Sequence, residues 1–92
     1  MPMSLSNIEA RGRTYAAARM MAGMDQGALA AATGLSGGTI SNVERGRESR
    51  ASTLKSIKRA LHKEGVVVAF STNNGLAIVS ISFAADEEED EQ

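Results

Sequence analysis

The sequence predicts a mainly α fold in which four helices are followed by a C-terminal β-hairpin. As far as Gly65, apolar residues recur at spacings of three and four, which is typical of helices packed on a core. Beyond it, the short runs VVVAF (66–70) and LAIVSISF (76–83) are rich in β-branched residues, which is typical of strands. The dipeptide Asn74-Gly75 in the connection is a strong hairpin signal.

The first helix is expected from Asn7 to Met21, with Gly23 as its C-terminal stop. Its apolar face is predicted from helical spacing, while its three arginines take other directions. That face comprises Ile8, Tyr15, Ala18, Met21 and Ala22. Met20, Met21 and Met24 are interpreted as core and turn packing, because methionine fills irregular gaps.

Two short helices follow, each with a side chain suited to cap its start. Asp25 is the expected N-cap of a helix over Gln26–Thr33, and Ser36 that of a helix over Gly37–Arg45. Their C-terminal glycines are Gly34 and Gly46. Ser52 is expected to cap a fourth helix that buries Leu54, Ile57 and Leu61 and ends at Gly65.

Both predicted strands are apolar at nearly every position, which implies cover on both faces. The helices can cover only one face, and an isolated two-stranded hairpin is marginal in water. We therefore expect a homodimer formed through the hairpin. The residues assigned to this dimerisation are Val66, Val68, Phe70, Leu76, Ile78 and Ile81. The expected organisation is a helical domain over 1–64, a dimerisation hairpin over 65–84 and a disordered acidic tail over 85–92.

Composition excludes several classes of protein. Without cysteine there can be no disulfide and no zinc-thiolate site, and one histidine, His62, cannot build a metal cluster. We expect no metal and no cofactor, and we find no nucleophile, base and ligand set that predicts an enzyme. The start lacks the features of a secretory signal and no apolar run approaches a membrane span, so a cytoplasmic location is expected.

Charge is distributed unevenly along the chain. Six of the eleven acids lie within the last seven residues, so residues 1–85 carry a net charge of +5. A basic body suits a polyanionic partner, although this excess is moderate. Three interpretations of the tail stay open: solubility, competition for the protein's own basic face, and binding of a protein partner.

The central segment has the parts of a helix-turn-helix, in which a small residue and an apolar lock hold two short helices at a steep angle. The segment QGALAAATGLSGGTISNVERG (26–46) resembles the Cro/C1-type family, also called the Xre family. Eleven positions match the family pattern: Gln26, Leu29, Ala30, Gly34, Leu35, Ser36, Thr39, Ile40, Val43, Glu44 and Gly46. The resemblance implies a four-helix, lambda-repressor-like domain that binds double-stranded DNA.

The resemblance also implies roles for individual residues. Gln26 should hydrogen-bond a DNA phosphate at the start of its helix. Glu44 should pair with a basic group, for which Arg19 is the best candidate, and so serve the fold rather than DNA. The exposed face of the third helix should read bases in the major groove. That face comprises Ser36, Gly37, Gly38, Thr39, Ser41 and Asn42.

Two glycines at the start of this helix depart from the usual long polar residues. Without side chains, Gly37 and Gly38 cannot contact base edges, so readout should depend on Asn42, Thr39 and Ser41. Either selection is relaxed at these glycines, or their backbone approaches DNA closely. Arg45, Arg47 and Arg50 should add salt-sensitive contacts to the phosphate backbone.

These interpretations favour a dimeric repressor that binds an inverted-repeat operator, with two recognition helices about 34 Å apart. One alternative is an antitoxin that represses its own operon and binds a toxin through its C-terminal segment. Another is a protein-binding module that keeps this fold but has weak base readout, for which the two glycines are the motivation.

Overall fold

The computed structural model describes residues 6–48 and 50–86. The predicted acidic tail therefore lies outside the described residues from position 87 onward. Four helices precede a two-stranded antiparallel sheet, as the sequence predicts. The elements are α1 (Asn7–Met21), α2 (Gln26–Thr33), α3 (Gly37–Glu44), α4 (Ala51–Lys63), β1 (Val66–Asn73) and β2 (Leu76–Phe83).

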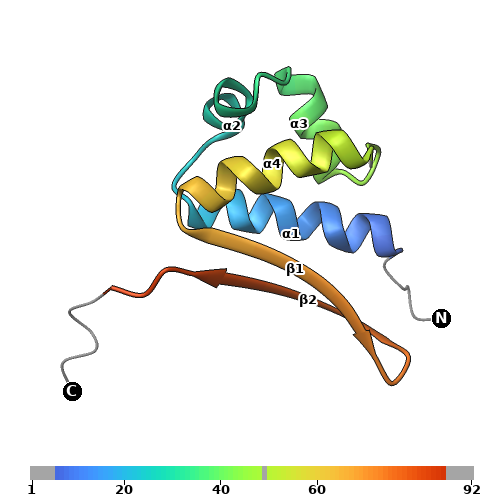
Figure 1. Ribbon diagram of the computed structural model, residues 1–92. Coiled ribbons are helices and arrows are strands. Elements are labelled where there is room, and N and C mark those ends of the chain that lie inside the picture. Colours follow the sequence, from blue (N-terminus) through green and yellow to red (C-terminus); the bar gives the residue numbers. More distant parts are fainter. Residues whose placement is uncertain (1–5, 49, 87–92) are drawn as a thin grey trace.

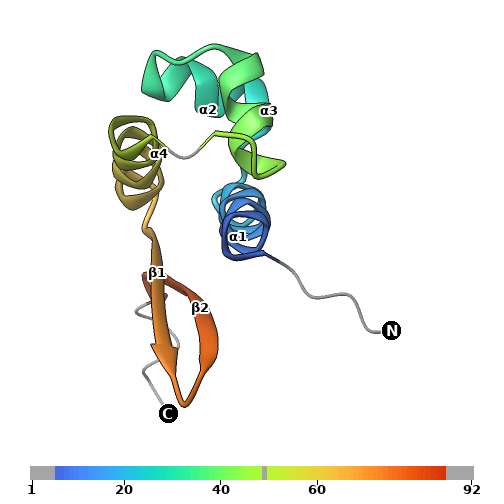
Figure 2. The ribbon, with the colours of Figure 1, turned by 90° about the vertical axis from the view of Figure 1, so that its right-hand side faces the viewer.

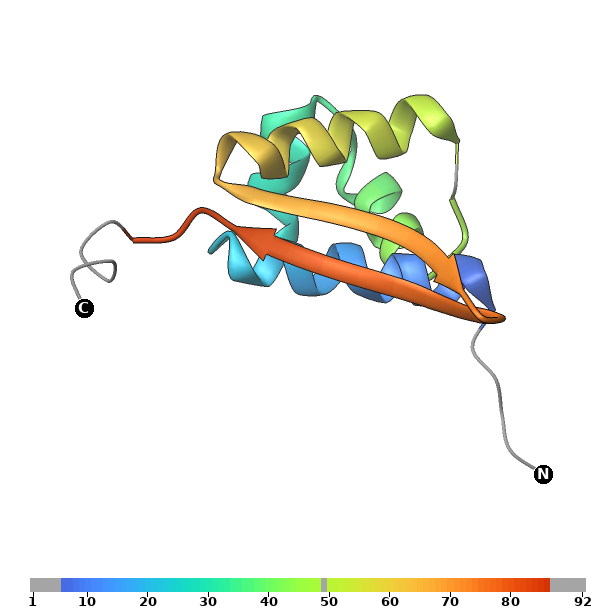
Figure 3. The ribbon, with the colours of Figure 1, turned by 60° about the horizontal axis from the view of Figure 1, so that its bottom comes forward.

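The elements form three layers (Figure 1). α1 packs against α3 and both strands, α4 packs against α2 and β1, and α2 packs against α3, so the pair α2–α3 lies on the opposite side of the domain from the hairpin. Figure 2 shows the same order from a second direction, with the hairpin farthest from α2. Figure 3 shows β1 running beside α4 and β2 beside α1. The hairpin therefore leaves the outer surface of α2 and α3 uncovered.

Side-chain caps explain where three helices begin. Ser6 and Glu9 form a capping box at α1, in which each side chain accepts a hydrogen bond from the other residue's backbone N–H. Asp25 caps α2, and Ser36 caps α3, by accepting backbone N–H groups three residues on. The prediction of Ser52 as the cap of α4 is wrong. α4 begins two residues earlier than that cap allows, with Arg50 in the N-cap position and no capping side chain.

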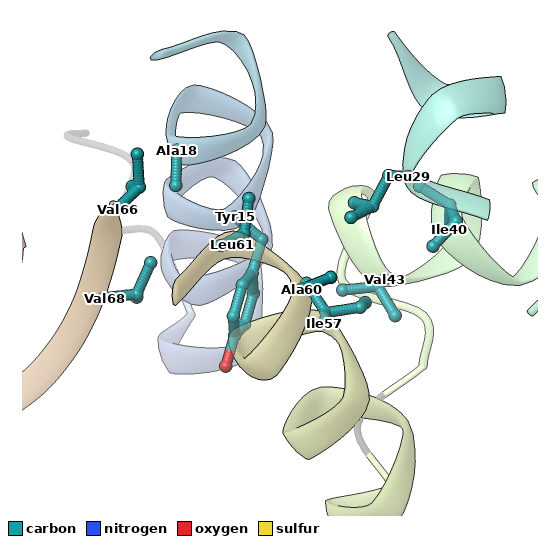
Figure 4. Close-up of a cluster of buried hydrophobic side chains, with 10 residues drawn as sticks. All are labelled: Tyr15, Ala18, Leu29, Ile40, Val43, Ile57, Ala60, Leu61, Val66 and Val68. Carbon is teal, nitrogen blue, oxygen red and sulfur yellow. The ribbon is translucent and has the colours of Figure 1, made fainter. Parts of the chain in front are cut away.

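The core lies where the four helices and β1 meet (Figure 4). Ten apolar side chains are buried there: Tyr15, Ala18, Leu29, Ile40, Val43, Ile57, Ala60, Leu61, Val66 and Val68. Three predicted core positions are corrected, because Ile8, Met20 and Met21 are 36%, 65% and 51% exposed. The neighbouring elements leave a large part of these three side chains exposed to solvent, although Met24 packs partly against the core as expected.

Gly12 allows α1 and the end of α3 to approach at backbone distance. A Cβ atom at this position would lie 2.5 Å from the Val43 carbonyl oxygen and 2.8 Å from that of Glu44. Gly46, with φ of +76°, lies just beyond α3 and faces the Glu9 backbone in the same crossing. A side chain at Gly12 would therefore force the two helices apart.

The hairpin is longer and its turn tighter than the sequence suggests. β1 continues through Ser71 to Asn73, so only Asn74 and Gly75 form the turn, with positive φ at both positions. This is the backbone that a two-residue hairpin with right-handed strand twist requires. The pairing of Val66 with Phe83 and of Asn73 with Leu76 fixes the register.

The hairpin buries one strand and exposes the other. Val66 and Val68 are 3% and 8% exposed and belong to the core, and the Phe70 ring packs edge-on against Tyr15 with centroids 5.6 Å apart. The burial of Val66 and Val68 corrects their assignment to a dimer interface, whereas Phe70 is half-buried and its assignment stays a prediction. Ile81 packs partly against the core. Among the residues assigned to dimerisation, Leu76 and Ile78 are exposed.

Within the described part of the chain, every helix is too short or too polar to cross a bilayer.

Candidate nucleic-acid interface

A buried ion pair joins α1 to the end of α3. Arg19 Nε donates to Glu44 Oε2 at 2.7 Å and Arg19 Nη2 donates to Glu44 Oε1 at 3.1 Å, which is the bidentate geometry. The two side chains are 12% and 8% exposed. The hydrogen bond to Glu44 raises the pKa of the Arg19 guanidinium, and Arg19 Nη1 also donates to the Met24 carbonyl. The predicted pairing of Arg19 with Glu44 is confirmed.

Gln26 extends this network to the start of α2. Its amide Nε2 donates to Glu44 Oε1 at 2.9 Å, so one carboxylate holds the beginning of α2 and the end of α3 in a fixed relation. A primary amide has a second N–H, which leaves Gln26 a donor for a phosphate. The Asp25 carboxylate at the same helix start accepts the Ala28 N–H.

The start of α3 is polar, exposed and almost without side chains. Ser36 Oγ lies 3.0 Å from Thr39 Oγ1, so these two hydroxyls bond to each other, and Ser36 Oγ also accepts the Thr39 backbone N–H. Gly37 and Gly38 are exposed, and a Cβ at either would meet nothing closer than 3.8 Å. The fold itself therefore does not require glycine at either position.

The other end of α3 brings together an amide and two arginines. Arg45 Nη2 donates a long hydrogen bond of 3.5 Å to Asn42 Oδ1, and the Arg47 backbone N–H donates to the Asn42 carbonyl at 2.7 Å. Both arginines are exposed, and Ser41 and Asn42 are half-buried. This end of α3 thus combines an amide able to bind a base edge with cations able to bind phosphate.

Arg50, the third arginine predicted to bind phosphate, forms an ion pair with Glu48. Its Nε and Nη2 donate to the two carboxylate oxygens of Glu48 at 3.0 and 3.1 Å, and its backbone N–H donates to Glu48 as well. These hydrogen bonds lower the pKa of the Glu48 carboxyl and raise that of the Arg50 guanidinium. Because the Arg50 side chain is 78% exposed, it can exchange Glu48 for a phosphate. Before DNA binds, however, its charge is already neutralised by Glu48.

Comparisons with known proteins agree with this geometry. A helix-turn-helix family model (HTH_3) matches residues 16–65, which contain α2, α3 and α4. The chain belongs to the Cro/C1-type (Xre) helix-turn-helix family. The clp gene regulator ClgR from C. glutamicum, a crystal structure, aligns with a TM-score of 0.62 and 32% identity over 67% of this chain and 81% of that chain. No curated protein sequence matches the chain.

Membership of this family makes the protein a DNA-binding transcriptional regulator. α2 and α3 are then the helix-turn-helix pair, and the Arg19–Glu44–Gln26 network fixes the angle between them. Among the described residues, no group of three or more acidic, histidine or cysteine side chains could hold a metal ion. The roles of the individual predicted DNA-contacting residues remain predictions.

Two features of the site escaped sequence reasoning. Glu48 interacts with one of the three predicted phosphate-binding arginines, although the motif RGRES showed an acid between Arg47 and Arg50. Gly12 lies in α1 and allows the end of α3 to pack closely against that helix. A glycine in the middle of a helical pattern was the sequence signal for this close approach.

Proposed function

We propose that the protein is a homodimeric repressor that binds an inverted-repeat operator, each chain placing α3 in a major groove. The observation that carries this proposal is the surface formed by the start of α2, the exposed face of α3 and residues 45–47. The Glu44 side chain holds α2 and α3 in a fixed relation through its hydrogen bonds with Arg19 and Gln26, so this surface is rigid before DNA binds. Rigid presentation lowers the entropy lost on binding.

Base readout is expected to be sparse. Asn42 is the best placed side chain for an adenine edge, whereas Thr39 is tied to Ser36. Arg45 and Arg47, together with the free N–H of Gln26, supply phosphate contacts that carry no sequence information directly. DNA shape and deformability are therefore expected to contribute much of the discrimination between sites.

The proposed dimer forms through β2 rather than through the inner face of β1. Four apolar side chains of β2 are at least 40% exposed: Leu76, Ile78, Val79 and Phe83. Beside the strand runs a groove of about 430 Å³ lined by Ala10, Thr14 and Ala17 of α1 and by Val79 and Ile81. The edge of β2 away from β1 pairs with no other strand among the described residues, so a second β2 could extend the sheet.

The proposal places the protein in the cytoplasm and assigns it no catalytic activity. The exposed apolar side chains of β2 also fit the antitoxin alternative, in which β2 binds a toxin. A toxin gene adjacent to this one would favour that alternative over the repressor.

Footprinting on the DNA upstream of the protein's own gene tests the proposal. We expect protection of two half-sites with centres about 34 Å apart, and protection that weakens steeply with salt. Asn42→Ala should relax specificity and Arg47→Ala should weaken binding to all sequences, while Lys63→Ala at the end of α4 serves as a control of equal charge change. A folded protein that protects no site would contradict the proposal.

A further inference from the structure

The exposed face of α4 carries a stripe of basic side chains that the helix-turn-helix does not use. Lys55, Lys58, Arg59, His62 and Lys63 recur at spacings of three, four, seven and eight, which places them on one side of the helix. All five are exposed, and the buried residues of α4 point the opposite way. α4 contains no acid, so the face is uniformly basic.

Part of this stripe lines a groove between α4 and β1, here called the α4 groove. It has a volume of about 310 Å³, with Lys55, Lys58, Arg59 and His62 as walls and Val67 and Val68 at the strand side. Lys58 Nζ lies 5.6 Å from the centroid of the Phe70 ring, which holds this cation near the strand. The salt bridges found within residues 6–48 and 50–86 involve none of these side chains.

The acidic C-terminal segment leaves the fold next to this groove. The Ala84 N–H donates to the Gly65 carbonyl at 2.9 Å, so the chain emerges directly after the end of α4 (Figure 3). Asp86 follows two residues later and begins the run of six acids. Seven residues from Asp86 to Gln92 can span about 23 Å when extended.

We propose that the segment 86–92 docks along the α4 groove of its own chain. From Lys63 back to Lys55, α4 rises about 12 Å, well within the reach of the segment. Arg50 lies about 20 Å from Lys63 along the same helix and is already neutralised by Glu48. The six acids of the segment are complementary in charge to the four Lys and Arg side chains of α4. Glu64 repels the segment where it leaves the fold and so directs it towards the middle of α4.

A spin label at the C-terminus tests the docking in the full-length chain. Because the protein has no cysteine, Gln92→Cys gives a single attachment site for a nitroxide. At low salt, the amide NMR signals of residues 55–63 should lose about twice as much intensity as those of residues 37–44. The difference should vanish near 0.5 M salt, because exposed charges are then screened. Stronger loss at residues 37–50, or no localised loss at low salt, would overturn the proposal.

Charge reversals then identify the groove. Lys55→Glu with Arg59→Glu should abolish the loss at α4, while Arg13→Glu with Arg47→Glu changes the net charge equally and should leave it in place. These side chains are exposed, so both double variants are expected to fold. Equal behaviour of the two variants would contradict docking in this groove.

A DNA duplex of unrelated sequence separates the acidic segment from DNA as the occupant. In the full-length labelled chain at about 0.1 M salt, docking predicts that the loss at α4 persists when the duplex is added. Disappearance of the loss together with shifts of the α4 amides would instead show that the groove is a DNA-backbone site, and would overturn the assignment.

Discussion

Two regions of the molecule differ in how well a single chain buries their side chains: the crossing of α1 with α3, and the hairpin. At the crossing, backbone meets backbone at Gly12, and the Arg19–Glu44 pair is fully bonded and nearly buried. In the hairpin, β1 contributes Val66 and Val68 to the core, whereas β2 leaves most of its apolar side chains in water. A single chain therefore buries the ion pair of the first region but leaves most apolar side chains of β2 exposed.

This difference assigns the two regions to different tasks. A close backbone crossing together with the Arg19–Glu44–Gln26 hydrogen bonds holds α2 and α3 at one angle, which is what a surface that must fit a DNA groove requires. A strand with exposed apolar side chains and an unpaired edge gains stability from a partner. Substitutions in the first region should therefore affect folding, and those in β2 should affect association.

The largest effect is expected from Gly12→Ala. The added Cβ would collide with two carbonyl oxygens of the main chain, which cannot move aside as a side chain could. We expect a loss of at least about 3 kcal/mol in the free energy of unfolding, measured by urea titration. Gly38→Ala is the matched control, because its Cβ would make only an ordinary contact, 3.8 Å from Ser36 Oγ, and helix propensity favours alanine by up to about 1 kcal/mol. Equal effects of the two changes would contradict the close approach.

The next effect is expected from Glu44→Ala. The change leaves Arg19 with a largely buried and unpaired guanidinium and frees Gln26, at a cost of about 3 kcal/mol in unfolding free energy. DNA affinity should fall further than stability alone explains, because the start of α2 loses its anchor. Glu48→Ala breaks the exposed pair with Arg50 and should leave the melting temperature unchanged. A Glu44→Ala variant as stable as the wild type would show that the network is dispensable.

A smaller effect, on association alone, is expected from Ile78→Lys with Val79→Lys. Both side chains are exposed in the monomer, so the variant chain should still fold. The dimer dissociation constant should rise at least about tenfold, which corresponds to about 1.4 kcal/mol. Sedimentation equilibrium measures this, with Ala32→Lys on α2 as the control. If the variant remains as dimeric as that control, the interface lies elsewhere.

The smallest effect concerns pH and the first turn of α1. The Ser6 backbone N–H lowers the pKa of the Glu9 carboxyl below its ordinary value of 4.5. The stabilisation is therefore complete above pH 4.5 and is lost as the pH falls through the lowered pKa. Between about pH 5 and pH 3, the wild type should lose more stability than Glu9→Gln, whose amide does not titrate. Parallel pH profiles would show that the capping box contributes no pH dependence.

The local elements were predictable from the sequence because each has a local cause. Asp25 and Ser36 cap the helices they were expected to cap, and Asn74-Gly75 forms the turn. The fold class, which depends on periodicity and these signals, is confirmed. The start of α4 was misplaced because Ser52 has the right chemistry but lies inside the helix, which begins without a side-chain cap.

What the sequence did not reveal depends on which surfaces meet. Met21 has helical spacing with Tyr15 and Ala18, yet no neighbouring element covers it in the monomer. The sequence pattern assigned Val66 and Val68 to the interface, but in the structure β1 packs on α4 and both side chains are buried. In the candidate DNA interface, the motif located Gln26 and Asn42, but the bond from Gln26 to Glu44 and the pairing of Arg50 with Glu48 require coordinates.

The open space around Gly37 and Gly38 has a consequence for how this regulator can change its targets. A longer side chain at either position would meet no atom of the fold at close range, so new base-contacting groups can be installed there without loss of stability. Glutamine, asparagine or arginine at these positions would add contacts to specific base edges. If α3 enters the major groove as we propose, single substitutions at its start should change which DNA sequences the protein prefers, in evolution or by design.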